Sequence, residues 1–169
     1  LFLFENFDEI VGLVEDGERY LGHWATRWTA IKGLIDFFNK ITEELVSPEA
    51  LIADNDPFLS AIGQAYLRYE QKLKGLNRLD FAHQQKIFLD LLLNPEVGPK
   101  IQAEACYVLV DEYQDTNYIQ EQLLLCLATP QSNLCVVGDD DQSLYRFRGA
   151  TVRNILEFGR NFEPCPQVW

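Results

Sequence analysis

Residues 107–150 read YVLVDEYQDTNYIQEQLLLCLATPQSNLCVVGDDDQSLYRFRGA, and this stretch contains two short apolar runs. The first run, Tyr107–Val110, ends in an Asp-Glu pair, and the second, residues 134–138, ends in three aspartates. The segment between them, residues 117–128, has the pattern of a helix. Two such runs joined by a helix predict a βαβ unit in a buried parallel sheet, and therefore an α/β fold. Because ligands bind outside the carboxyl ends of parallel strands, we expect both strands to deliver carboxylates to the same edge.

The sequence before this stretch predicts helices. Apolar residues recur at helical spacing at Trp28, Ile31, Ile35, Phe38, Ile41 and Leu45, then at Leu59, Ile62, Tyr66, Tyr69 and Leu73, and then, facing inward, at Phe81, Phe88, Leu91 and Leu92. Ser47-Pro48 and Asp56-Pro57 are helix-start signatures, in which a polar N-cap precedes a proline in the first turn. Gly75 predicts the end of the second of these helices. The character of the chain therefore changes near Ala105, from helical to α/β.

Composition and charge limit the classes of partner. The chain has 26 acidic and 14 basic residues and a net charge of −12, which argues against a nucleic-acid partner because phosphate binding depends on Lys and Arg. The charge describes the whole chain, however, and a local basic or aromatic face can coexist with it. No apolar run approaches the roughly 18 residues of a membrane span, so no membrane partner is predicted.

The cysteines indicate a reducing environment. Cys106, Cys126, Cys135 and Cys165 form no C-x-x-C pair, and His23 and His83 are the two histidines of the sequence. Buried free thiols are the expected state, which suits the cytoplasm, and no zinc site is predicted.

The end of the first apolar run carries the pattern of a phosphate-transfer site. An Asp-Glu pair after a buried strand is typical of nucleotide hydrolases, in which the first carboxylate holds Mg²⁺ and the second orients or deprotonates the attacking water. Asp111 would take the metal role and Glu112 the water role. The alternative is that the pair leads the chain from the strand into solvent, since short motifs often match by accident.

The residues after the second run add a further set of candidates. Gln142 carries a neutral amide that can donate to a γ-phosphate oxygen, although a glutamine in an acidic surface turn is the plain alternative. Tyr145 and Phe147 alternate with Arg146 and Arg148, so the rings can stack on bases while the arginines reach phosphates. A buried aromatic pair with solvated arginines explains the same pattern equally well.

Two long segments resemble a known family. Residues 108–117, VLVDEYQDTN, resemble motif II of the UvrD/Rep-type superfamily 1 DNA helicases, and residues 137–150, VGDDDQSLYRFRGA, resemble their motif III. Leu79-Asp80-Phe81, followed by Leu91-Leu92, is similar to a short motif that precedes motif II. The resemblance is strong over residues 65–162, and two long motifs in the right order make it specific.

The resemblance implies a fold and a role for each candidate. The fold would be part of a RecA-like P-loop NTPase lobe with a parallel sheet, preceded by an all-helical subdomain. Asp111 would bind Mg²⁺, Glu112 would activate water, and Gln142 would contact the γ-phosphate of ATP and couple it to DNA. Tyr145 and Phe147 would stack on single-stranded DNA, and Arg148 would link the DNA and ATP sites. The family usually has Trp where this chain has Phe147, which implies weaker stacking there.

The resemblance also implies a division of the chain. Residues 1–57 would form part of a helical insertion subdomain, residues 58–105 would be helices leading back into the ATPase lobe, and residues 106–169 would form part of the RecA-like core. The sequence contains no methionine and no G-x-x-x-x-G-K-[ST] phosphate-binding loop. We therefore expect an interior fragment that by itself hydrolyses no ATP and unwinds no DNA.

The parent protein implied by the resemblance is an ATP-dependent DNA helicase. It would couple ATP hydrolysis to movement on single-stranded DNA and to duplex unwinding in the 3′-to-5′ direction. Its partners would be single-stranded DNA, duplex junctions, ATP, and repair or recombination proteins in the cytoplasm. A catalytically degenerate nucleic-acid-binding module of the same fold is a second hypothesis, although Asp111, Glu112 and Gln142 are all intact. A helicase subunit of a nuclease complex is a third hypothesis, and a plain α/β scaffold with solvated acidic turns is a fourth.

Overall fold

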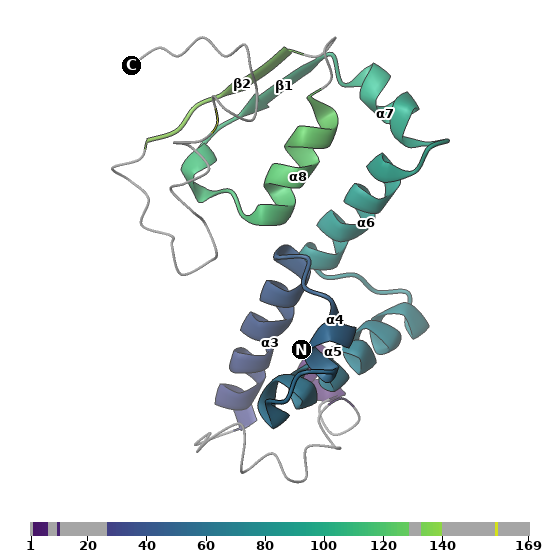
Figure 1. The fold of residues 1–169 in the computed structure, drawn as a ribbon, viewed down its shortest axis with the longest axis vertical. Coiled ribbons are helices and arrows are strands. Elements are labelled where there is room, and N and C mark those ends of the chain that lie inside the picture. Colours follow the sequence, from purple (N-terminus) through teal and green to yellow (C-terminus); the bar gives the residue numbers. More distant parts are fainter. Residues whose placement is uncertain (1, 7–9, 11–26, 129–132, 140–157, 159–169) are drawn as a thin grey trace. The chain divides into compact units, whose positions relative to one another are not determined.

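The computed structural model describes residues 2–6, 10, 27–128, 133–139 and 158. The chain divides into two compact units, Leu1–Phe81 and Ala82–Trp169. Figure 1 shows helices in the first unit, and helices with a pair of strands in the second. The helical-to-α/β change expected from the sequence is therefore present, while the segment boundaries expected after residues 57 and 105 stay predictions.

The first unit contains helices α1 (Phe2–Glu5), α3 (Arg27–Glu43), α4 (Pro48–Ile52) and α5 (Pro57–Gly75). Both predicted helix starts are confirmed. The Ser47 hydroxyl caps α4 by accepting a hydrogen bond from the backbone N–H of Ala50 at 3.2 Å. The Asp56 carboxylate caps α5 by accepting from the N–H of Phe58 at 2.8 Å. These caps satisfy N–H groups that have no partner inside the helix, so the sequence sets where α4 and α5 begin.

The first unit has its own hydrophobic core. Its buried residues are Leu3, Ile10, Ile31, Leu34, Phe38, Ile41, Ile62, Ala65, Tyr66, Tyr69 and Leu73. The stripe predicted on α5 is confirmed from Ile62 onward. The stripe predicted on α3 is wrong at Ile35, which is 38% exposed, because Leu34 takes the inward position on that turn. Leu45, also predicted on that stripe, lies beyond the end of α3 and is 37% exposed.

Two tyrosine hydroxyls of α5 are satisfied inside this unit. The Tyr66 hydroxyl lies 2.9 Å from Oγ1 of Thr42, which itself donates to the Phe38 carbonyl. The Tyr69 hydroxyl donates to the Asp80 carboxylate at 2.6 Å. Burial is the main cause that raises the pKa of Tyr66 to about 12, and burial also raises the pKa of Tyr69. Both phenols are therefore neutral at physiological pH.

The second unit begins within α6 (Phe81–Leu93) and continues through α7 (Gly98–Glu104), β1 (Tyr107–Val110), the 3₁₀ turn η1 (Tyr113–Asp115), α8 (Tyr118–Leu127) and β2 (Asn133–Val136). The predicted helix between the two strands is confirmed, with Asn117 as its N-cap. The Asn117 side chain accepts from the N–H of Gln120, and the Gln120 side chain accepts from the N–H of Asn117, both at 3.1 Å. This reciprocal capping box satisfies two backbone N–H groups and fixes where α8 begins.

The inward face of α6 differs from the prediction. Its buried residues are Ala82, His83, Leu89 and Leu92. Of the four residues predicted to face inward, Leu92 is buried, whereas Phe81 is 86% exposed and Phe88 and Leu91 are partly exposed. Apolar residues occur on several sides of this helix, so spacing alone does not identify the buried side.

The two strands form the predicted parallel pair. Tyr107 pairs with Asn133 and Val110 with Val136, and α8 connects the strands and lies beside them in Figure 1. The expectation of a buried sheet is wrong for alternate residues of β1, because Tyr107 is 78% and Leu109 is 81% exposed. Successive side chains of a strand point to opposite faces, so the half-buried Val108 and Val110 lie on the other face.

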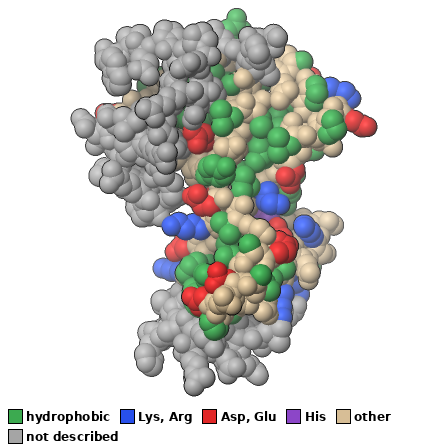
Figure 2. Space-filling view, viewed as in Figure 1, with side chains coloured by type: hydrophobic (Ala, Val, Ile, Leu, Met, Phe, Trp, Pro, Cys, Tyr) green, Lys and Arg blue, Asp and Glu red, His purple; other side chains and the backbone are tan. Residues whose placement is uncertain are grey.

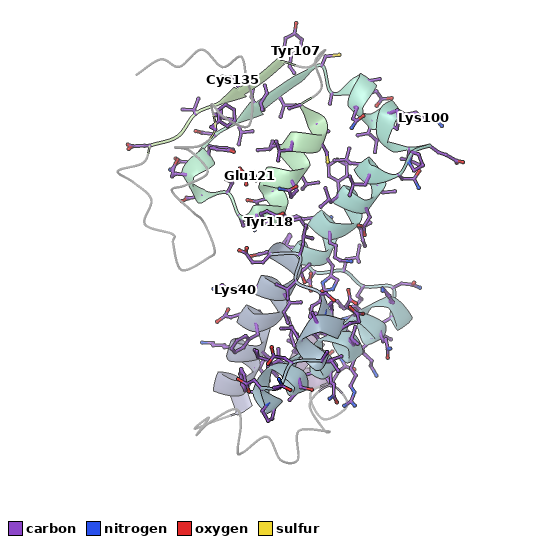
Figure 3. The ribbon with its side chains drawn as sticks, viewed as in Figure 1. Lys40, Lys100, Tyr107, Tyr118, Glu121 and Cys135 are labelled. Atoms are coloured by element: carbon purple, nitrogen blue, oxygen red, sulfur yellow. The ribbon has the colours of Figure 1, made fainter. Side chains whose placement is uncertain are left out.

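The cysteine environment also differs from expectation. Cys106 and Cys135 are free and exposed, and Cys126 is free and half-buried, with burial raising the pKa of its thiol. Figure 3 shows both Cys135 and Tyr107 on the sheet. Cys165 lies outside the described residues. None of the described helices combines the length and apolar character that a bilayer-crossing segment needs.

Candidate active site at the carboxyl ends of the strands

The carboxyl ends of β1 and β2 lie at one edge of the sheet. Hydrogen bonds continue past the strands, from the N–H of Val137 to the Val110 carbonyl at 2.8 Å and from the N–H of Tyr113 to the Val137 carbonyl at 3.0 Å. Asp111 and Glu112 follow β1 at this edge and are exposed, and Asp139 follows β2. The expectation that both strands deliver carboxylates to the same edge is therefore confirmed for these three residues.

Glu112 has a backbone conformation that is rare for its residue type. Its φ of 52° and ψ of 42° lie in the left-handed helical region, where a Cβ atom crowds the backbone. The Asp111 carboxylate helps hold this conformation, because its Oδ1 accepts from the N–H of Glu112 at 2.9 Å. The turn directs the chain from β1 into η1. A strained residue at the end of a strand is often part of a functional site.

The Glu112 carboxylate has a defined neighbour. The side-chain amide of Gln114 donates from Nε2 to Oε2 of Glu112, and its Oε1 accepts from the backbone N–H of Asp139 at 3.0 Å. Gln114 is 1% exposed. Sequence reasoning missed this residue, although it lies within motif II. No local sequence signal identifies it, because the contact with Asp139 joins residues 25 positions apart.

Buried residues of η1 and its C-cap support the backbone that follows Glu112. Tyr113 is 0% exposed, and its ring packs edge-on against Phe158 with centroids 5.1 Å apart. Burial, with a smaller contribution from the Glu121 carboxylate, raises the pKa of Tyr113 to about 12. The Thr116 hydroxyl donates to the Tyr113 carbonyl at 2.7 Å. These contacts fix the backbone directly after Glu112.

Four predicted site residues fall in a part of the chain that the structure does not describe. Gln142, Tyr145, Phe147 and Arg148 all lie outside the described residues. The structure therefore brings together the two motif II carboxylates, Asp111 and Glu112, with the first residues after β2.

Asp111 is the residue that suits a divalent cation here. Among the described residues no group of three or more His, Cys, Asp or Glu side chains is arranged to hold a metal. Mg²⁺ at nucleotide sites needs no such group, since it binds one or two carboxylates together with water and substrate phosphates. Asp111 uses Oδ1 for the N–H of Glu112, and its carboxylate is exposed at the strand end. Its donor chemistry therefore fits the predicted metal role.

The described charged residues give no continuous basic track on the face drawn in Figure 2. Lys and Arg side chains are scattered there among Asp and Glu side chains. The predicted DNA contacts rest on residues 145–148, outside the described ranges.

Comparison with known proteins gives a consistent result. Residues 11–163 match the UvrD/REP helicase N-terminal domain. The chain is 37% identical over 141 residues to the ATP-dependent DNA helicase UvrD1 of Mycobacterium tuberculosis, covering 76% of this chain and 18% of that protein. It is 38% identical over 137 residues to the ATP-dependent DNA helicase PcrA of Staphylococcus epidermidis, covering 80% and 19%. It is 34% identical over 123 residues to the putative ATP-dependent DNA helicase YjcD of Bacillus subtilis, covering 72% and 16%. The chain thus spans less than a fifth of the length of these relatives.

Proposed function

The chain belongs to the UvrD/REP helicase family, and from this we propose that it forms part of the motor of an ATP-dependent DNA helicase. The observation that carries the proposal is the shared edge of β1 and β2, where Asp111 and Glu112 follow one strand and Asp139 follows its parallel neighbour. In parallel sheets this edge is where ligands bind. The names of the relatives, ATP-dependent DNA helicases, support the same activity for the full-length protein that carries this sequence.

The proposed reaction is the hydrolysis of ATP by a water molecule that attacks the γ-phosphorus. Glu112 orients this water and accepts its proton, while the bond from the γ-phosphorus to the bridging oxygen breaks and ADP leaves. Asp111 holds Mg²⁺, which when bound supplies positive charge that offsets the charge developing on the phosphate oxygens. Gln142 contacts the γ-phosphate and couples its presence to DNA.

The proposal extends to the fold and to DNA. Residues 106–169 form part of a RecA-like lobe, residues 1–57 part of a helical insertion, and residues 58–105 the helices that lead back into the lobe. Tyr145 and Phe147 stack on bases of single-stranded DNA, and Arg148 links the DNA site to the ATP site. ATP hydrolysis drives movement on single-stranded DNA and 3′-to-5′ unwinding at duplex junctions, in repair or recombination in the cytoplasm.

The proposal is tested by ATP hydrolysis in the full-length protein, with and without single-stranded DNA. Glu112→Gln keeps the size of the side chain but removes its capacity to accept a proton. We expect kcat to fall about 10²- to 10⁴-fold, the range for loss of a general base, while ATP binding is retained. Glu104→Gln is the matched control, because Glu104 is an exposed carboxylate at the end of α7, away from the predicted site residues in sequence.

Two results would contradict the proposal. Unchanged DNA-stimulated hydrolysis in Glu112→Gln would remove the assigned role from Glu112. A wild-type protein that binds single-stranded DNA but hydrolyses no ATP would instead identify a degenerate binding module of the same fold.

A further inference from the structure

The side-chain amide of Gln114 connects the residues that follow β1 to the residues that follow β2. Its Nε2 donates to the carboxylate of Glu112, and its Oε1 accepts from the backbone N–H of Asp139 at 3.0 Å. The first contact is to the residue proposed to activate water. The second is to the segment that follows β2. The amide therefore lies between the ends of two strands that are distant in sequence.

The chemistry of the two neighbours admits one arrangement of this amide. A backbone N–H can only donate, and an ionised carboxylate can only accept. An amide satisfies both with its oxygen toward Asp139 and its nitrogen toward Glu112, which is the arrangement observed. A carboxylate in place of Gln114 would leave two acceptors facing each other. An apolar side chain would leave the N–H of Asp139 without this acceptor.

Gln114 is itself held firmly, so it can fix the position of a neighbour. It is 1% exposed and lies in η1, between the buried Tyr113 and the start of α8. The turn is anchored to the extended strand pair by the hydrogen bond from the N–H of Tyr113 to the Val137 carbonyl. Glu112, in contrast, is exposed and has a flexible side chain that loses conformational freedom when it is fixed. The buried amide reduces the number of conformations open to this carboxylate.

We infer that Gln114 is a positioning residue for Glu112, which it holds through its side-chain amide while taking its own position from the N–H of Asp139. The inference rests on the proposed function, because it assigns Gln114 a role in hydrolysis through Glu112. It adds that the Glu112 carboxylate and the backbone of Asp139, after β2, both hydrogen-bond to the buried amide of Gln114. A displacement of Asp139 would therefore displace the Glu112 carboxylate.

The test measures steady-state ATP hydrolysis by the full-length protein with saturating single-stranded DNA. Gln114→Met removes both hydrogen bonds at similar volume. We expect kcat to fall about 10- to 100-fold, as is common when a group that orients a reacting residue is lost, while KM for ATP changes less than about threefold. Gln120→Met is the matched control. It removes an amide hydrogen bond of the same kind, to the N–H of Asn117 in the capping box of α8, and we expect it to leave kcat within about twofold of wild type.

A double variant separates positioning from general loss of structure. If Gln114 acts through Glu112, adding Gln114→Met to Glu112→Gln lowers kcat no further than Glu112→Gln alone. If Gln114 only supports the fold, the two losses multiply, and the inference is overturned. Wild-type kcat in Gln114→Met overturns it as well.

Gln114→Glu gives an independent readout if Gln114→Met fails to fold. It keeps an acceptor toward the N–H of Asp139 but replaces the donor toward Glu112 with a second carboxylate, which repels the Glu112 carboxylate. We expect kcat to fall about 10-fold or more while KM for ATP changes less than about threefold. Wild-type kcat in a folded Gln114→Glu protein contradicts the inference. If Glu112→Gln itself retains activity, the proposed function fails instead, which distinguishes the two failures.

Discussion

At the scale of single residues, Glu112 combines an exposed carboxylate with a backbone conformation that most side chains avoid. Its left-handed φ of 52° is held by the Asp111 carboxylate and by the anchored turn that follows. A left-handed residue with a Cβ costs roughly 1–2 kcal/mol relative to an ordinary conformation. The surrounding contacts must therefore offset this strain to keep the carboxylate at the strand edge.

This strain can be measured by comparing two truncations. Glu112→Ala and Glu112→Gly both remove the carboxylate, but Gly has no Cβ to crowd the backbone. We expect Glu112→Gly to be more stable than Glu112→Ala by about 1 kcal/mol in urea unfolding, the reverse of the order inside a helix. An alanine variant as stable as the glycine variant would show that the left-handed conformation is absent in solution.

At the scale of elements, α4 and α5 approach closely at a glycine. A Cβ built on Gly63 would lie 2.9 Å from Cγ1 of Ile52 and 3.0 Å from Cβ of Leu51, both on α4. Contacts this short force neighbouring atoms to move. Gly75, at the end of the same helix, has nothing within 4 Å of such a Cβ. A side chain at Gly63 would therefore collide with α4, whereas there is room for a side chain at Gly75.

The expected effects of alanine at these glycines have opposite signs. Gly63→Ala should lower the free energy of unfolding by about 1–3 kcal/mol through overpacking between α4 and α5. Gly75→Ala should raise it by about 0.4–1 kcal/mol, because alanine restricts the unfolded chain. Urea titration of both variants measures the difference. Equal effects of the two substitutions would contradict the close approach of α4 to α5.

The same elements show what the sequence could and could not predict. The boundaries of α5 were predictable because Asp56-Pro57 and Gly75 mark its ends, and a regular stripe marks its face. The buried side of α6 was not predictable, because apolar residues occur on several sides of this helix. The edge position of Asp111 and Glu112 followed from the end of an apolar run. The contact of Gln114 with Asp139 did not, because it depends on a left-handed turn at a glutamate, which no residue pattern predicts.

At the scale of the whole molecule, each unit buries a tyrosine whose ionisation opposes folding. The pKa of Tyr66 in the first unit and that of Tyr113 in the second are both raised to about 12 from an ordinary value of 10.0, mainly by burial. A folded-state pKa above the unfolded value means that the neutral form is favoured by folding. The stabilising contribution is complete below pH 10 and is lost as the pH rises toward 12.

We therefore expect the free energy of unfolding to fall steeply between about pH 10 and pH 12, with the unfolded chain releasing protons first. Tyr66→Phe should lower the free energy of unfolding by about 1 kcal/mol at neutral pH, because the hydrogen bond to Thr42 is lost. Above pH 10 the gap in free energy of unfolding between this variant and wild type should narrow. Urea titrations at a series of pH values measure this gap. Tyr118→Phe, at an exposed position, is the control, and a gap for Tyr66→Phe that stays constant with pH would count against the buried phenol.

The parallel register of β1 and β2 also bears on how the chain acquires its structure. Tyr107 pairs with Asn133 across the whole of η1 and α8, so the sheet forms only after a long loop has closed. Non-local pairing of this kind slows folding, whereas helices joined by short turns, such as α4 and α5, form quickly. We therefore expect the strand edge that carries Asp111 and Glu112 to assemble after helices such as α4 and α5, so that the two carboxylates reach their final neighbours late in folding.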